Sequence, residues 1–174
     1  DRHRDFHAGD REAQQAAGAL EATFGDATAA MTANAEAAAG TVGLSEAAYA
    51  QMASTIGSQL GNMGVAQDEI AGTTDALIAK GADLAAQFGG STADAVSALS
   101  SLMRGERDPI ERYGVSLSAA AIEAQKARTG LSGLTGEADR AATTQATLAL
   151  LSQQTASSTG AFARETGTAA GAQA

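Results

Sequence analysis

The chain has 174 residues, enough for one domain with a buried core and too few for three. Its net charge of −9 excludes the basic face that duplex DNA requires, because neutralising phosphates needs clustered lysine and arginine. The lack of cysteine excludes disulfides and thiolate sites. Aromatic residues make up only 3%, and alanine supplies most of the apolar share, so helices should form easily but bury little surface each.

The sequence carries no signal for a membrane. No run reaches the roughly 18 apolar residues that a spanning helix needs, and no charged-then-apolar leader opens the chain. Because the first residue is Asp1 rather than methionine, we expect the chain to be a segment of a longer polypeptide. No sequence-specific binding of nucleic acid is expected from so acidic a chain.

Residues 1–42 are predicted to form a charged, alanine-rich helical extension. His3 and His7 have the i, i+4 spacing that can present two imidazoles to one metal, but a zinc site needs more ligands, so we interpret them as part of a solvated helix end. The remainder reads as one loose helix, continuous or broken, that suits a single partner rather than a whole core. Its sparse apolar anchors are Leu20, Phe24 and Met31.

Residues 43–135 are predicted to form a helical section in several pieces. Ser45 is suited to cap a helix that ends near Gly61. A second helix is predicted over residues 66–88, where buried positions alternate in steps of four and three, as in an antiparallel hairpin or short coiled coil. The two apolar stripes are Tyr49, Met52, Ile56 and Leu60, and then Ile70, Thr74, Leu77, Gly81, Leu84 and Phe88.

The next helix is predicted to end in a corner at residues 105–114, which contain the only proline. Ser91 and Asp94 have the spacing of a capping box that opens this helix, and Gly105 should close it. Its apolar stripe is Val96, Leu99, Leu102 and Met103.

Within the corner, Asp108 is predicted to cap a short helix over residues 109–113 that Gly114 closes. Basic and acidic residues are interleaved, which favours a local ion-pair network over an anion site or an acid-base pair. They are Arg104, Arg107 and Arg112 with Glu106, Asp108 and Glu111.

After the corner, a helix capped by Ser116 or Ser118 carries Ile122 and ends at Gly130. A glycine- and serine-rich link with Leu131 and Leu134 follows. Residues 136–174 are predicted to form a long C-terminal helix with Leu148, Leu151 and Phe162 on its stripe. It should run at least to Ser158 and continue beyond Gly160 only if something packs on the small, polar tail.

No segment alternates like a strand, so the predicted fold is all-α: alanine- and glycine-rich helices in hairpins or a loose bundle, with a longer C-terminal helix. No catalytic base, phosphate loop or metal cluster is evident, so we predict no enzyme activity and no cofactor. The stripes are interpreted as core, with self-association into homo-oligomers as the alternative. The packing or interaction candidates are Tyr49, Met52, Ile56, Ile70, Leu77, Leu84, Phe88, Leu99, Leu102, Pro109, Ile110, Tyr113, Leu148, Leu151 and Phe162.

Five segments, in order, resemble tail tape measure proteins of phages and prophages, from Gly43 to Gly171. Their order carries the resemblance, because each alone is unspecific. The segments are Gly43-Leu44-Ser45-Glu46 with the helix to Gly61-Asn62-Met63-Gly64; Ala82 to Phe88; the corner Leu102-Met103-Arg104-Gly105-Glu106 with Pro109 to Val115; Leu148 to Gly160; and Phe162-Ala163-Arg164-Glu165-Thr166 with the small residues that follow.

The resemblance implies a structural virion protein that sets tail length and occupies the tail lumen. It implies tail tube, tail tip and tail assembly chaperone proteins as partners, in the host cytoplasm during assembly and in the virion tail afterwards. If fully helical, the chain would span at most roughly 260 Å, at 1.5 Å per residue, and its glycine breaks make it a compact section of the ruler. The alternative is a small helical secreted or surface adaptor.

Overall fold

The computed structural model describes the backbone of residues 2–173 and the side chains of residue 11 and residues 13–167. The described chain is 79% helical and has no strand, which confirms the all-α fold. None of its helices combines the length and the apolar character needed to cross a membrane. The elements are α1 (Arg2–Phe24), η1 (Gly25–Ala27), α2 (Thr28–Thr41), α3 (Glu46–Asn62), α4 (Gln67–Phe88), α5 (Thr92–Met103), α6 (Asp108–Glu111), α7 (Ala119–Arg128), α8 (Gly136–Gln154), η2 (Ala156–Ser158) and α9 (Ala161–Gln173).

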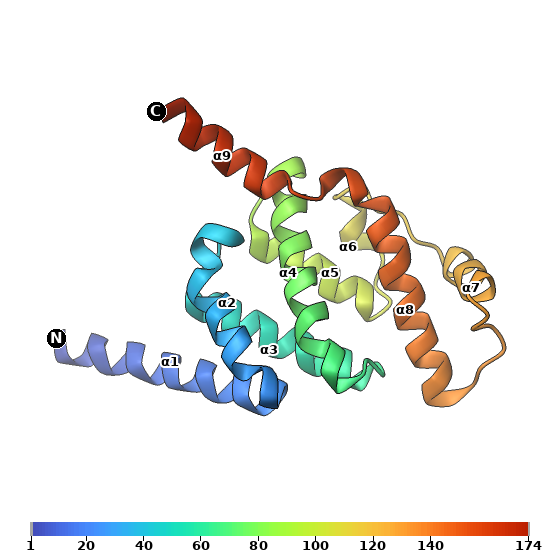
Figure 1. Ribbon diagram of the computed structural model, residues 1–174, viewed down its shortest axis with the longest axis horizontal. Coiled ribbons are helices and arrows are strands. Elements are labelled where there is room, and N and C mark those ends of the chain that lie inside the picture. Colours follow the sequence, from blue (N-terminus) through green and yellow to red (C-terminus); the bar gives the residue numbers. More distant parts are fainter. Residues whose placement is uncertain (1, 174) are drawn as a thin grey trace.

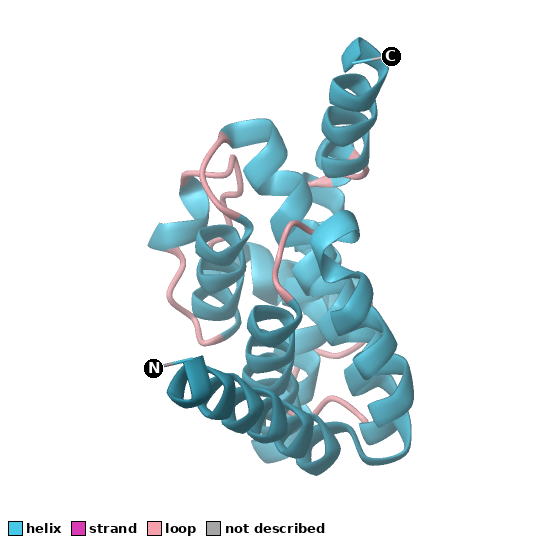
Figure 2. Cartoon of the chain, turned by 90° about the vertical axis from the view of Figure 1, so that its left-hand side faces the viewer, coloured by secondary structure: helices cyan, strands magenta, loops and turns pink. Residues whose placement is uncertain are grey.

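Helix α4 runs through the middle of the molecule (Figure 1). It packs against α5 and α3, and α1 and α2 cover α3 on one side. On the other side α7 and α8 form a second hairpin, and α9 crosses back to α4 before it projects from the body. Short loops join the helices (Figure 2), and most helices that follow one another in the chain, such as α4 and α5 or α7 and α8, pack against each other.

Serine hydroxyls start three of the helices, as local sequence predicts. Ser45, Ser91 and Ser118 each accept a hydrogen bond from the backbone N–H three residues on, at 3.0 to 3.1 Å. These bonds satisfy N–H groups that have no partner within the first turn. Between the two serines suggested for α7, the structure selects Ser118.

Glycines in the left-handed region end helices α3, α5 and α7. Gly105 has a φ of 93°, and the following N–H of Glu106 bonds the Ser101 carbonyl at 2.9 Å. The same pattern occurs after Gly64 and Gly130. This two-bond helix ending requires a positive φ, which glycine adopts without strain. The predicted corner therefore begins where expected.

The cap predicted for the short helix in the corner is wrong. Helix α6 begins at Asp108 itself, Arg107 occupies the N-cap position, and no side-chain hydrogen bond caps the helix. Pro109 lies in its first turn, where a missing N–H costs nothing. Ile110 is fully buried, so burial of this apolar side chain, rather than a cap, fixes the short helix.

The loose helix expected near the N-terminus is two helices that double back. Gly25, with a φ of 52°, lies in the short 3₁₀ turn between α1 and α2. Because the chain reverses there, Leu20 and Phe24 on α1 and Met31 on α2 all enter one core and are at most 3% exposed. These three apolar residues were expected to contact a single partner helix, but they are part of the common core.

The single long helix predicted over residues 136–174 is also wrong. Helix α8 ends at Gln154, a 3₁₀ turn follows, and α9 begins at Ala161. Gly160 has a φ of 85°, which no α-helix allows. Contacts with α4, described below, stabilise this break.

The core lies where α3, α4 and α5 meet. The stripe predicted on α4 is buried from Ile70 to Leu84. Gly81 lets the two helices approach closely, because a Cβ at this position would lie 2.5 Å from Cγ2 of Val96 on α5. Small residues thus replace part of the side-chain packing that larger residues provide elsewhere.

Candidate functional site

Asp83 on α4 joins this helix to the start of α9. Its carboxylate oxygens accept hydrogen bonds from the backbone N–H of Gly160 at 2.9 Å and of Phe162 at 3.0 Å. These N–H groups belong to the open first turn of α9, where a negative charge also interacts favourably with the helix dipole. Asp83 therefore acts as an N-cap supplied from a distant part of the chain.

Lys80, one turn before Asp83, binds the end of α8. Its ammonium group donates to the Thr159 hydroxyl at 2.7 Å and to the backbone carbonyl of Thr155 at 3.4 Å. Thr155 follows the last residue of α8, where a positive charge complements the helix dipole. One face of α4 thus binds the carbonyl end of α8 and the amide end of α9.

A third segment meets this junction at Gly43. A Cβ on Gly43 would lie 3.2 Å from the Phe162 ring, so the ring rests almost directly on the backbone. The neighbouring carbonyl of Val42 accepts a hydrogen bond from the Thr92 hydroxyl at 2.8 Å. We call the residues Gly43, Lys80, Asp83, Gly160 and Phe162 the junction.

The corner contacts the C-terminal end of α4, just beyond the junction, through aromatic side chains. The rings of Phe88 and Tyr113 meet edge to face with centroids 6.5 Å apart. The guanidinium of Arg112 lies over the Tyr113 ring, 5.3 Å from its centroid. Phe88 also lies close to Gly114. Phe88 does not continue the buried stripe of α4, because it is the last helical residue and is 43% exposed.

The ion-pair network predicted around the corner is reduced to one loose contact among the described residues. Arg104 and Glu106 lie 3.8 Å apart, and both side chains are more than half exposed. Such a pair contributes little to stability. The guanidinium of Arg104 is instead held by the hydroxyls of Ser100 and Ser101, each at 3.2 Å.

The well-formed ion pairs are at Lys126, which sequence reasoning missed. Its ammonium contacts Asp139 at 2.6 Å and Glu123 at 3.0 Å, and the lysine side chain is only 3% exposed. Hydrogen bonds to Asp139 and then to Glu123 raise the pKa of Lys126, against the opposing effect of burial. This triad ties α7 to α8. Its only signal in the sequence was helical i, i+3 spacing within α7.

Buried Tyr49 is bound to α4. Its hydroxyl donates to Asp75 at 2.6 Å. Burial and this hydrogen bond to a carboxylate raise the pKa of Tyr49 well above its usual value. The pairing is structural, because it closes α3 onto α4 and leaves no room for a substrate between the two groups.

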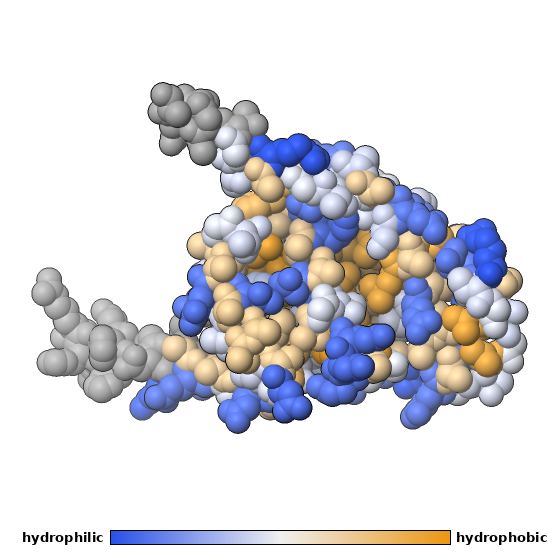
Figure 3. Space-filling view, in the orientation of Figure 1, coloured by the Kyte–Doolittle hydropathy of each residue, from blue (hydrophilic) through white to orange (hydrophobic). Residues whose placement is uncertain are grey.

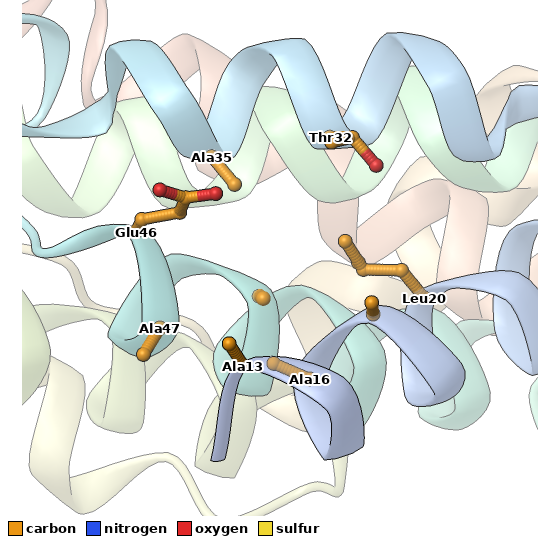
Figure 4. Close-up of a pocket in the computed structure, with 9 residues that line it drawn as sticks. Ala13, Ala16, Leu20, Thr32, Ala35, Glu46 and Ala47 are labelled. Atoms are coloured by element: carbon orange, nitrogen blue, oxygen red, sulfur yellow. The ribbon is translucent and has the colours of Figure 1, made fainter. Parts of the chain in front are cut away.

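An apolar pocket of about 220 Å³ lies between α1, α2 and the start of α3 (Figure 4). Alanines and Leu20 line it, with Thr32 and Glu46 as the polar groups. Figure 4 shows Glu46 at one end and Leu20 at the other. Glu46 is the titratable side chain in this lining.

A second apolar hollow of about 330 Å³ separates α4 from α8. Leu77, Leu148 and Leu151 line it, and apolar atoms are visible on the face between these helices in Figure 3. The α7–α8 hairpin is thus not packed flush against the body along its whole length.

The packing candidates divide by burial rather than gathering in one site. Phe88 and Tyr113 touch at the corner, Phe162 lies at the junction, and Pro109 is exposed. Met52, Leu148 and Phe162 are half-buried and packed against the core. The fully buried members are Tyr49, Ile56, Ile70, Leu77, Leu84, Leu99, Leu102, Ile110, Tyr113 and Leu151.

The side chains of His3 and His7 lie outside the described residues. Among the side chains that are described, no three of His, Cys, Asp and Glu gather as metal ligands would. Sequence reasoning also missed the roles of Lys80 and Asp83. Their i, i+3 spacing beside the apolar stripe of α4 was the available signal.

No family model matches the chain, and no curated protein or solved structure is significantly similar to it in sequence or in fold.

Proposed function

We propose that the chain is an internal segment of a phage or prophage tail tape measure protein. In this role it is a non-enzymatic structural part of the virion tail that helps to set tail length during assembly and occupies the tail lumen. Its partners would be tail tube, tail tip and tail assembly chaperone proteins, met first in the host cytoplasm.

The observation that supports this proposal is that the resembling segments meet one another in space. Gly43 begins the first segment, Asp83 belongs to the second, and Gly160 and Phe162 belong to the last two. These residues form the junction through two carboxylate hydrogen bonds and a ring packed on a glycine. Phe88, at the end of the second segment, rests on the corner, which is the third.

The geometry also suits a compact section of a mostly helical ruler. The junction fixes the direction in which α9 leaves the body, and α9 projects from the body as a helix (Figure 1). In a tape measure protein, such a section would be a compact folded part between extended helical segments.

Mass spectrometry of purified tail particles tests the proposal. Particles separated from cells that express this chain should yield its tryptic peptides, together with peptides of tube and tip proteins. The same gene should encode many hundreds of residues with long heptad tracts. Recovery only in particle-free medium, from a short reading frame with an export signal, would contradict the proposal and support the adaptor.

A further inference from the structure

The α7–α8 hairpin is attached to the body of the molecule over a small area. The two helices pack on each other, and among the described residues neither of them packs along α3, α4 or α5 (Figure 1). Two hollows flank α8 instead. The hollow toward α4 has a volume of about 330 Å³, and the one toward α3 and the corner has about 890 Å³ and is lined mostly by polar side chains. Helix α8 adds Ala146, Leu150 and Leu151 to the described core, so it meets the body along a narrow strip.

The first half of α8 contacts the body where α3 ends. The hydroxyl of Thr144 donates a hydrogen bond to the backbone carbonyl of Met63 at 3.2 Å. Beside this bond, a Cβ on Gly64 would lie 2.9 Å from the Cβ and 3.3 Å from the Cα of Ala141. The two backbones therefore meet with no room for a further side chain. We call Met63, Gly64, Ala141 and Thr144 the latch.

The two ends of the hairpin are joined to each other at a neck. The side-chain amide of Gln154 accepts a hydrogen bond from the N–H of Ser116 and donates one to its carbonyl oxygen, both at 2.8 Å. On the body side of this pair, Leu117 and Thr155 are buried, and the carbonyl of Thr155 accepts a hydrogen bond from Lys80. The neck therefore lies at the ends of α7 and α8, between anchored chain and hairpin, where hinges commonly occur.

The hairpin is held together more firmly than it is held to the body. Lys126 on α7 is 3% exposed and binds Asp139 on α8 at 2.6 Å and Glu123 at 3.0 Å. Hydrogen bonds between charged groups are stronger than the neutral bonds of the latch and the neck. When the attachments to the body break, α7 and α8 should therefore stay together.

We propose that the α7–α8 hairpin is a hinged flap, which swings as one unit about the neck and detaches at the latch. In the closed state, Thr144 binds Met63, and α8 faces Leu77 of α4 across the smaller hollow. In the open state, water replaces the latch bond and Leu77 becomes accessible. The open state is the minor one, at roughly 1% of the molecules. This inference does not depend on the proposed function.

Thiol labelling measures the open population, because the chain has no cysteine of its own. Leu77→Cys places a thiol beneath α8, where the leucine is only 5% exposed. Leu84→Cys places one on the same helix at a position that is 0% exposed, as a probe of global unfolding. At position 77 a bulky thiol reagent should react at roughly 1% of its rate with the unfolded chain. This rate should depend little on urea, because a swing exposes little surface, whereas labelling at position 84 should be slower and rise steeply with urea.

Two glycines supply a wedge for the latch and its matched control. Gly64 and Gly105 end α3 and α5 with φ values of 89° and 93°, so an alanine at either position carries a similar backbone strain. At Gly105 nothing lies within 4 Å of the added Cβ, whereas at Gly64 it would press on the backbone of Ala141. In the Leu77→Cys chain, Gly64→Ala should therefore accelerate labelling about tenfold relative to Gly105→Ala, because overpacking disfavours the closed state.

The neck supplies a second pair of variants, which tests the hinge if Gly64→Ala does not fold. Gln154→Ala removes both hydrogen bonds to Ser116 and should accelerate labelling at position 77 about threefold. Gln153→Ala, at the exposed neighbouring position, should leave the rate unchanged. Circular dichroism shows which variants are folded.

Amide hydrogen exchange distinguishes a swing from unfolding of the hairpin. If the hairpin swings as one unit, amides in the middle of α8 should open with a higher free energy than the thiol at position 77. Equal free energies would overturn the proposal, because α8 would then unfold rather than swing. Equal rates and urea dependences at positions 77 and 84, a thiol at position 77 as reactive as in the unfolded chain, or equal effects of the variants within each pair would also overturn it.

Discussion

The α4–α5 hairpin and the α7–α8 hairpin are both rich in alanine, but different forces hold them. In the first, Leu77, Leu84 and Leu99 are buried, and Gly81 brings the helices close together. In the second, the contact centres on Lys126 with its two carboxylates. Large apolar side chains dominate the contact in the first hairpin, whereas in the second a buried lysine supplements the few apolar side chains, Ile122, Leu150 and Leu151.

The attachment of each hairpin to the rest of the molecule shows the same difference. Helix α4 lies inside the apolar core. Helix α8 adds only Ala146, Leu150 and Leu151 to the described part of that core. It also bonds the body through Thr144, whose hydroxyl donates to the Met63 carbonyl at 3.2 Å, and through Gln154, which forms two 2.8 Å hydrogen bonds with the backbone of Ser116. We therefore expect the α7–α8 hairpin to open more readily than the core.

The largest expected effect comes from a charge in the first hairpin. Leu84→Asp and Leu102→Asp each place an unpaired carboxylate at a position that is at most 3% exposed. The cost of several kcal/mol is comparable to the whole stability of a domain. Both variants should lose cooperative thermal unfolding by circular dichroism, whereas Leu134→Asp, at an exposed position, should melt like the parent. Unaltered melting of the two core variants would contradict the packing described here.

Sequence reasoning succeeded where structure is decided locally. The caps at Ser45 and Ser91 and the ending at Gly105 involve residues within one turn, so their signals are visible in a short window. The buried stripe of α4 also follows from helical spacing, except at its last residue.

The junction could not be predicted, because its contacts cross most of the chain. Asp83 and Gly160 are 77 residues apart, and nothing near either one indicates the other. The break between α8 and α9 depends on these contacts, so the local sequence pattern alone predicted a single helix across it. Lys126 was missed for a similar reason, since a lysine on a short polar helix is usually exposed.

Two glycines on α4 allow the effect of close packing on stability to be distinguished from the effect of helix propensity, because only Gly81 lies against a neighbouring helix. Gly81→Ala should destabilise the fold by about 1–2 kcal/mol, because its Cβ would meet Val96 and overpacking outweighs the gain in helix propensity. Gly72→Ala has nothing within 4 Å of its Cβ and should stabilise by about 0.5–1 kcal/mol. Urea unfolding measures both, and equal effects of one sign would refute the close approach of α4 and α5.

A smaller effect is expected at the junction. Asp83→Asn keeps an acceptor but removes the charge and one of its oxygens, so stability should fall by about 0.5–1 kcal/mol. Hydrogen exchange should accelerate at the amides of Gly160 and Phe162, while α5 stays protected. The control Asp68→Asn lies in the first turn of α4, at the opposite end of that helix from Asp83. Unchanged exchange at Gly160 would mean that Asp83 does not cap α9.

The smallest effect on global stability is expected in the second hairpin. Lys126→Ala leaves Glu123 and Asp139 partly exposed to water, 66% and 41% respectively, so neither becomes a buried unpaired charge. Hydrogen exchange should still accelerate across α7 and the start of α8, and Arg128→Ala is the control within α7. Equal protection in both variants would contradict the role of the triad.

The pKa of Lys126 sets a pH dependence for the same hairpin. Because its pKa is raised in the folded chain, the stabilisation is fully present below the usual lysine pKa of about 10.4 and is lost as the pH rises through the higher folded value. Proteolysis of the loop between α7 and α8 should therefore increase at alkaline pH in the parent chain but depend less on pH in Lys126→Ala.

The two hydrogen bonds of Asp83 attach α9 to α4 at the N-terminal end of α9, so a small rotation there produces a large displacement at the C-terminal end. The helix has 13 residues and is roughly 20 Å long, but Asp83 holds only its first turn. A rotation of about 10° at that turn would move the far end of α9 by roughly 3 Å. The contacts of the first turn at the junction, those of Asp83 among them, therefore set the direction of the whole helix, and a modest change there moves its far end by a larger distance.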